Sequence, residues 1–129
     1  MPVLRIDHYN LRANSELLEI LRHFYCDIVG LEMGVRPPLK SIGYWLYAGE
    51  KDVLHLSQTA PDEIRESHVL TTFDHIAFSC DDFKTIESRL ITKGITYKQS
   101  EVPSTGQIQL FFNDPAGNRI ELNFAPPKT

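Results

Sequence analysis

The chain carries the same pattern twice, and this repeat constrains its fold more than any other feature. Ile6-Asp7-His8-Tyr9 is echoed by Phe73-Asp74-His75-Ile76, and Val53-Leu54-His55-Leu56 by Arg119-Ile120-Glu121-Leu122, at nearly the same separation. A fixed internal spacing indicates one structural unit used twice. We therefore expect a single domain, residues 1–129, made of two modules over about 1–58 and 73–125, with a linker over about 59–72.

Each half of the chain predicts one helix and four strands. The Asp-His pairs belong to an opening strand, and helices follow over about Ser15–Ile28, with Ser15 as N-cap, and Asp82–Lys93; Gly30 and Gly94 end them. Apolar stripes at helical spacing mark both helices, with Ile91 in the second. Three further strands are expected in each half, over about 31–36, 42–48 and 52–58, then 95–102, 106–113 and 118–124. Each half is thus β-α-β-β-β, and a short helical turn is expected in the linker near 62–65.

Composition narrows the function classes. The chain has 129 residues, 42% of them hydrophobic, which suffices for a core without disulfides. The formal net charge of -4, without a basic patch, argues against nucleic acid as a partner. No apolar run approaches the roughly 20 residues that span a bilayer, and no leader pattern opens the chain. We expect a cytoplasmic protein with no membrane partner, and Cys26 and Cys80 as buried thiols.

Strand alternation places the repeated polar residues on one face of each module. Leu54 and Leu56 point to one face of their strand and His55 to the other, and the last strand repeats this arrangement with Glu121. Gln109 and Phe111 should share the face of Glu121, and Trp45 is the repeat equivalent of Phe111. Imidazoles and a carboxylate on inner faces would be costly unless a divalent metal coordinates them. His23 and His68 have no repeat equivalent and are assigned to a helix surface and the linker.

These positions give the chain a resemblance to the vicinal oxygen chelate superfamily, which includes glyoxalase I, bleomycin-resistance proteins and extradiol dioxygenases. The likeness covers nearly the whole chain, and the stretch from Gln109 through Asp114-Pro115-Ala116-Gly117-Asn118 to Leu122 is its most specific part. The resemblance implies an α+β fold in which two tandem modules form an eight-stranded cup with the helices on its outer face. It also implies that His8, His55, His75 and Glu121 hold one divalent ion: Zn, Ni or Fe, with Mn or Co as further options.

The number of ligands decides among the chemistries of that superfamily. Four protein ligands leave two open positions, which favours a glyoxalase I-like lyase or isomerase that stabilises an enediolate, with Glu121 and His55 as catalytic groups. If His55 is an acid or hydrogen-bond donor instead, the remaining three ligands suit an extradiol dioxygenase or a fosfomycin-type thiol transferase. A non-catalytic, bleomycin-resistance-like binding protein is the third alternative. Glyoxalase I carries a carboxylate where this chain has His55.

The remaining expectations concern the substrate and the assembly. A small-molecule substrate would lie among apolar walls, the donor Gln109 and the cation Arg36, with Lys98 and Arg119 as other possible anchors for a carboxylate or phosphate. The walls are Trp45, Tyr47 and Phe111. We expect a homodimer, in which each site is formed either within one chain or from exchanged halves.

Overall fold

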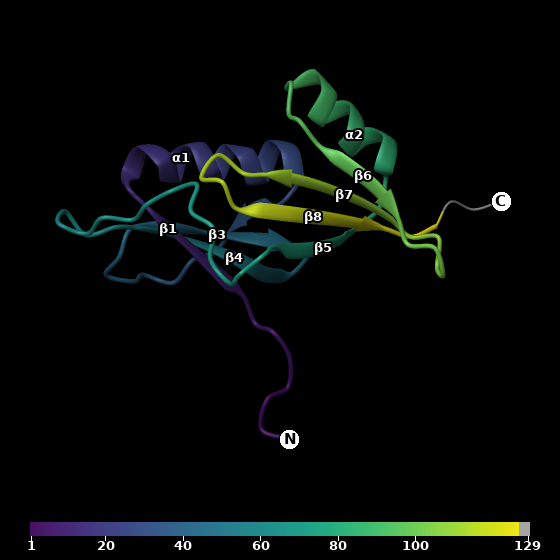
Figure 1. The fold of residues 1–129 in the computed structure, drawn as a ribbon. Helices are drawn as coiled ribbons and strands as arrows, with labels where there is room; N and C mark the ends of the chain where they lie inside the picture. Colours follow the sequence, from purple (N-terminus) through teal and green to yellow (C-terminus); the bar gives the residue numbers. More distant parts are fainter. Residues whose placement is uncertain (127–129) are drawn as a thin grey trace. The chain divides into compact units, whose positions relative to one another are not determined.

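The computed structural model describes residues 1–126 of the chain. The chain divides into two compact units, unit 1 over Met1–Glu66 and unit 2 over Ser67–Thr129. Each unit contains one four-stranded mixed sheet and one α-helix in the order β-α-β-β-β (Figure 1). The duplicated α+β organisation expected from the sequence is therefore present.

Unit 1 builds its sheet in the order β1-β4-β3-β2. The first strand, β1, runs parallel to β4, and the other pairs are antiparallel. The element bounds are β1 Tyr9–Ala13, α1 Ser15–Phe24, β2 Glu32–Gly34, β3 Gly43–Ala48 and β4 Lys51–Gln58. A π-helical turn, η1, follows α1 over Tyr25–Val29, and Gly30 ends it at φ 97°, a conformation that glycine adopts without strain.

The core of unit 1 lies between α1 and the inner face of its sheet. Leu18, Leu21 and Tyr25 on the helical side are fully buried, as are Leu54 and Leu56 on β4. Each buried aliphatic side chain contributes about 1.5–3 kcal/mol by leaving water. Because successive strand residues point to opposite faces, this burial leaves His55 on the face that α1 does not cover.

Unit 2 repeats the topology with the strand order β5-β8-β7-β6, in which β5 and β8 are parallel. Its element bounds are β5 Ile76–Cys80, α2 Phe83–Thr92, β6 Lys98–Glu101, β7 Ile108–Asn113 and β8 Arg119–Phe124. Leu90 on α2 is fully buried, as are Leu110, Ile120 and Leu122 on the sheet. The alternation again turns Glu121 to the other face of β8.

Several local expectations were wrong. Asn14, not Ser15, caps α1, because its side chain accepts a hydrogen bond from the backbone N–H of Leu17 at 2.9 Å. Residues 62–65 form no helix, since only a turn closes at Ala60–Glu63. Ile91 is 63% exposed, so it lies outside the buried stripe of α2. Strand pairing begins at Tyr9 and Ile76, one residue after each Asp-His pair.

The cysteines and the helices add two further facts. Cys26 and Cys80 are free thiols as expected, but both are only partly buried; this partial burial raises the pKa of each, that of Cys80 to about 11. Among the described residues, no helix is long and apolar enough to cross a membrane.

Candidate functional site

The two Asp-His pairs have the same geometry in both units. His8 Nδ1 donates to Asp7 Oδ2 at 2.7 Å, and His75 Nδ1 donates to Asp74 Oδ2 at 2.7 Å. A carboxylate on Nδ1 fixes the ring orientation and the tautomer, so that the Nε2 lone pair is available to a metal ion. Both histidines therefore have the orienting partner that is typical of metal-ligating imidazoles.

In unit 1, His55 lies at the centre of a stack of three rings. Its centroid is 3.7 Å from that of His8 and 4.1 Å from that of Trp45, and the ring planes are within 16° and 6° of parallel. The Nε2 atom of His55 lies 2.7 Å from Asp52 Oδ2. The stack and this bond fix the imidazole plane, and they leave Nδ1 as the ring nitrogen not bonded to Asp52.

Asp7 and Asp52 are joined by Lys51. The Nζ atom of Lys51 donates to Asp7 Oδ1 at 3.0 Å and to Asp52 Oδ1 at 3.2 Å. The bond from His55, together with Lys51, lowers the pKa of Asp52 to about 2, and the bond from His8 with Lys51 lowers the pKa of Asp7. Both carboxylates are therefore ionised at neutral pH and favour a positive charge on the histidine side of the site.

In unit 2, Glu121 faces His75 directly. Glu121 Oε1 lies 3.2 Å from His75 Nε2, while Gln109 Nε2 and Asn123 Nδ2 donate to Glu121 Oε2 at 3.2 and 3.1 Å. Glu121 is only 7% exposed, and among the described residues 1–126 Asp114 is the only other buried charged side chain. The two amide donors hold this buried carboxylate with one oxygen turned toward the imidazole.

The environment of His75 fits a bound cation. A neutral imidazole has one N–H and one lone pair, yet both ring nitrogens of His75 face carboxylate oxygens. A proton or a metal ion removes the resulting repulsion. Donor atoms that share an ion at about 2.1 Å lie about 3.0–3.4 Å apart, which matches the separation of 3.2 Å between Nε2 and Oε1. Within residues 1–126, however, no three His, Cys, Asp or Glu side chains gather as a ready metal centre.

The expected substrate residues divide into two groups. Trp45 stacks on His55, Phe111 meets the His75 ring edge to face at 5.8 Å, and Gln109 donates to Glu121. These three therefore adjoin the proposed ligands of their own units. Tyr47 and Arg36 have other partners, and neither contacts a proposed ligand.

Tyr47 and Arg36 hold the segment between β2 and β3. The hydroxyl of Tyr47 donates to the carbonyl of Val35. The guanidinium of Arg36 donates to the carbonyl and to Oγ of Ser41, each at 2.9 Å. These bonds engage the Tyr47 hydroxyl and the two terminal nitrogens of Arg36, whereas Nε of Arg36 is buried without a hydrogen-bond partner among the described residues. Both residues stay proposed substrate contacts.

The structure adds site residues that were not predicted from the sequence. Asp7, Asp74 and Asp52 each bond a site histidine, and Asn123 bonds Glu121. The first two could have been found from the sequence, because the repeated unit is an Asp-His pair rather than a lone His. Asp52 lies three residues before His55 and had no such signal.

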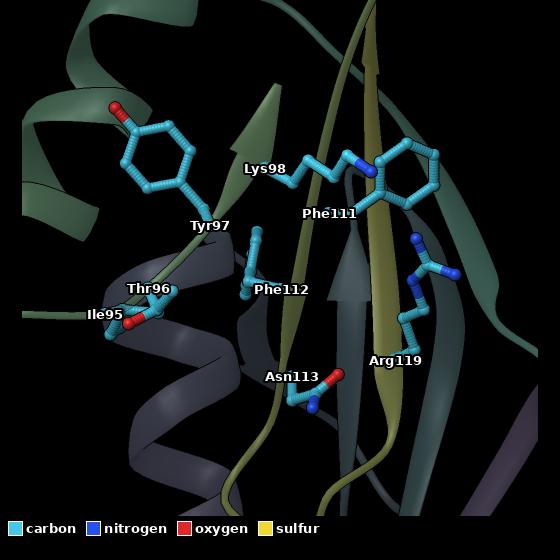
Figure 2. Close-up of a pocket in the computed structure, with 8 residues that line it drawn as sticks. All are labelled: Ile95, Thr96, Tyr97, Lys98, Phe111, Phe112, Asn113 and Arg119. Atoms are coloured by element: carbon cyan, nitrogen blue, oxygen red, sulfur yellow. The ribbon is translucent and has the colours of Figure 1, made fainter. Parts of the chain in front are cut away.

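One pocket of unit 2 adjoins the same face. It has a volume of about 460 Å³, and the exposed cations Lys98 and Arg119 flank Phe111, which lines the pocket together with Tyr97 and Phe112 (Figure 2). The guanidinium carbon of Arg119 lies 4.5 Å from the centre of the Phe111 ring. This pocket contains the two cations that the sequence analysis named only as other possible anchors.

Comparisons with known proteins agree with the duplicated fold. Over 104 aligned residues the chain is 32% identical to glyoxylase I 4 of Arabidopsis thaliana. The aligned region covers 78% of this chain and 60% of that relative. The chain therefore spans about 60% of the length of that protein.

Two solved structures share the fold at low sequence identity. One is a glyoxylase/bleomycin resistance protein/dioxygenase domain from Frankia sp. EAN1pec (TM-score 0.74, 18% identity, covering 95% of this chain and 98% of that chain). The other is a lactoylglutathione lyase from Agrobacterium tumefaciens (TM-score 0.64, 24% identity, 96% of each chain). The sequence model of one family matches residues 5–122, nearly the whole chain. The chain therefore belongs to the Glyoxalase/Bleomycin resistance protein/Dioxygenase superfamily.

Proposed function

We propose that the protein is a divalent-metal-dependent, glyoxalase I-like lyase or isomerase that acts on a small substrate with two chelating oxygens. The observation that carries the proposal is the pair formed by His75 and the buried Glu121, in which Asp74 orients the imidazole and two amides orient the carboxylate. The relatives named glyoxylase I and lactoylglutathione lyase support the reaction class.

The proposed ligands come in two pairs, one from each unit. His8 and His55 stack on each other in unit 1, and His75 contacts Glu121 in unit 2. We propose that the pairs together bind one ion of Zn, Ni or Fe, or of Mn or Co, either within one chain or between two chains of a homodimer. A bound divalent ion supplies Lewis acidity, which stabilises the negative charge that develops on an enediolate-like substrate oxygen.

Glu121 and His55 are the proposed proton-transfer groups. Gln109 and Asn123 hold Oε2 of Glu121, so Oε1 is the oxygen available to accept a proton. His55 is aligned by Asp52 through Nε2, which leaves Nδ1 to bind the ion or to exchange a proton with substrate. Trp45 and Phe111 would exclude water from the reacting oxygens.

The bond between His55 and Asp52 also favours a second candidate. If Nε2 of His55 stays hydrogen-bonded to Asp52 and no ion binds Nδ1, the metal ligands are only His8, His75 and Glu121. Two imidazoles and one carboxylate leave three open positions, which suits an extradiol-type Fe(II) dioxygenase or a fosfomycin-type thiol transferase. His55 would then be an acid or hydrogen-bond donor toward substrate.

A metal-reconstitution assay tests the proposal. Protein stripped of metal is supplied with Zn, Ni, Fe, Mn or Co in turn and assayed for isomerisation of the hemithioacetal of methylglyoxal and glutathione. We expect activity with at least one ion, abolished in Glu121→Gln and retained in His23→Ala, whose imidazole lies on the surface of α1. If wild type is inactive with every ion, the glyoxalase I-like proposal fails, and catechols with Fe(II) and fosfomycin with thiols become the next assays.

A protein that binds no metal under any supply would support the third alternative, a non-catalytic small-molecule binding protein. The oligomeric state is a separate measurement. We expect a homodimer by light scattering on the purified chain, and a monomer that is fully active would contradict the proposed assembly.

A further inference from the structure

The pocket of unit 2 lies at the end of the sheet where β7 and β8 approach the Asp114–Asn118 turn (Figure 2). Phe111 and Asn113 come from β7, Lys98 from β6 and Arg119 from β8. At about 460 Å³ the pocket is within the range of cavities that bind small molecules.

Strand register places part of the pocket lining on the sheet face that carries Glu121. Lys98 pairs with Phe111, and Phe111 pairs with Glu121, so these three side chains lie side by side on one face across three neighbouring strands. Arg119 precedes Glu121 by two residues on β8 and therefore shares that face. Lys98, Phe111 and Arg119 therefore line the pocket from the face that carries Glu121, whereas Phe112 lines it from the opposite, buried face of β7.

The lining is positively charged. Lys98 and Arg119 are the only ionised side chains that line the pocket, and both are cations. The guanidinium of Arg119 lies over the Phe111 ring, and its bond to the carboxylate of Asp74 is 3.5 Å long, at the upper limit of hydrogen bonding. No ion pair of Lys98 is found within the described residues 1–126. Two cations beside an aromatic surface therefore have capacity for an external anion.

We propose that this pocket binds an oxyanion group of the substrate, a carboxylate or a phosphate, between Lys98 and Arg119. The proposal rests on the proposed function, because it assigns the tail of a substrate whose reacting oxygens face His75 and Glu121. The tail would extend from Glu121 across Phe111.

Strand spacing sets the length of that substrate. Lys98 lies two strands from Glu121, about 10 Å, and Arg119 lies two residues along the strand, about 7 Å. The substrate class is therefore a small organic acid or phosphate ester whose anionic group is separated from its chelating oxygens by a short chain. A neutral 2-oxoaldehyde alone would leave Lys98 without an anionic partner and Arg119 with only the long contact to Asp74.

Anion binding to metal-free protein tests this assignment independently of any metal centre. Wild type, stripped of metal on a chelating resin, is titrated at constant ionic strength with succinate, inorganic phosphate and the neutral analogue succinamide. Amide NMR shifts locate the binding. We expect both anions to move the resonances of Phe111 and Arg119, while succinamide does not. The tighter of the two anions identifies the group as a carboxylate or a phosphate.

Matched variants distinguish a specific anion-binding site from nonspecific electrostatic attraction of anions to the protein. Lys98→Gln and Arg119→Gln should each weaken anion binding about tenfold, whereas Lys84→Gln, a lysine of α2 in the same unit, should leave it unchanged. Equal weakening in all three variants, or no shift at the pocket in wild type, would overturn the proposal. If the protein binds the anions but binds no metal, the anion-site proposal stands and only the proposed metal-dependent reaction fails.

Discussion

Asp74→Asn should weaken metal binding while leaving the fold intact. The carboxylate of Asp74 accepts the Nδ1–H of His75 at 2.7 Å, and it keeps Nε2 free on the side of Glu121. Asparagine has nearly the same shape, but it removes the negative charge that makes the imidazole a stronger donor to a metal ion. The variant therefore isolates the electrostatic role of the residue.

The size of the expected loss of metal affinity depends on how exposed the hydrogen bond between Asp74 and His75 is. Partners of metal-bound histidines are worth about 10- to 100-fold in metal affinity, which corresponds to about 1.4–2.8 kcal/mol. The side chain of Asp74 is 71% exposed, so solvent screens its charge. We therefore expect the lower end, about a tenfold loss of affinity.

Competition with a chromophoric chelator at constant pH measures that affinity. Asp27→Asn is the matched control, because Asp27 also faces a histidine, His23, but at 3.9 Å and away from the site. The control should bind metal as wild type does. Equal metal affinity of Asp74→Asn and Asp27→Asn would show that Asp74 does not prepare His75 as a ligand.

Three further predictions concern stability and thiol reactivity. Leu110→Ala removes a side chain that is 0% exposed and should lower the free energy of unfolding in urea by about 2–5 kcal/mol, whereas Leu70→Ala, at a site 97% exposed, should change it by less than about 0.5. The ion pair with Arg12 lowers the pKa of Glu63 from the ordinary 4.5 to about 2. Above pH 4.5 the wild type should therefore have a higher melting temperature than Glu63→Gln, and this difference in melting temperature should vanish as the pH falls toward 2. Burial raises the pKa of Cys80 to about 11, so in a Cys26→Ser background alkylation by iodoacetamide should be slow at neutral pH and accelerate as the pH approaches that value; fast labelling at neutral pH would contradict it.

The parts of the fold that follow from periodicity were predictable. Leu54 and Ile120 are buried while His55 and Glu121 face the other way, as alternation requires. The repeat predicted the same element order, β-α-β-β-β, in both units. The turn η1 and the cap at Asn14 were not predictable, because neighbouring residues with similar propensities compete for each helix end.

The candidate site was predictable in its residue types but not in its contacts. Duplication selected His8, His55, His75 and Glu121, and the structure brings together two pairs of them, each within one unit. Tyr47 and Arg36 have the chemistry of substrate contacts, yet they bond Val35 and Ser41. Such bonds depend on how a loop folds back, which strand alternation does not determine.

The most direct test of the account is the metal content of the purified protein. Wild type, His55→Ala and Glu121→Ala are grown with several metals supplied and analysed for bound metal. We predict a stoichiometric divalent ion in wild type that is lost in both variants. If His55→Ala retains its metal and Glu121→Ala loses it, the ligands are His8, His75 and Glu121 alone. That result would favour the oxygenase or thiol-transfer alternative over the glyoxalase-like reaction. No metal in wild type under any supply would show that these residues do not form a metal site.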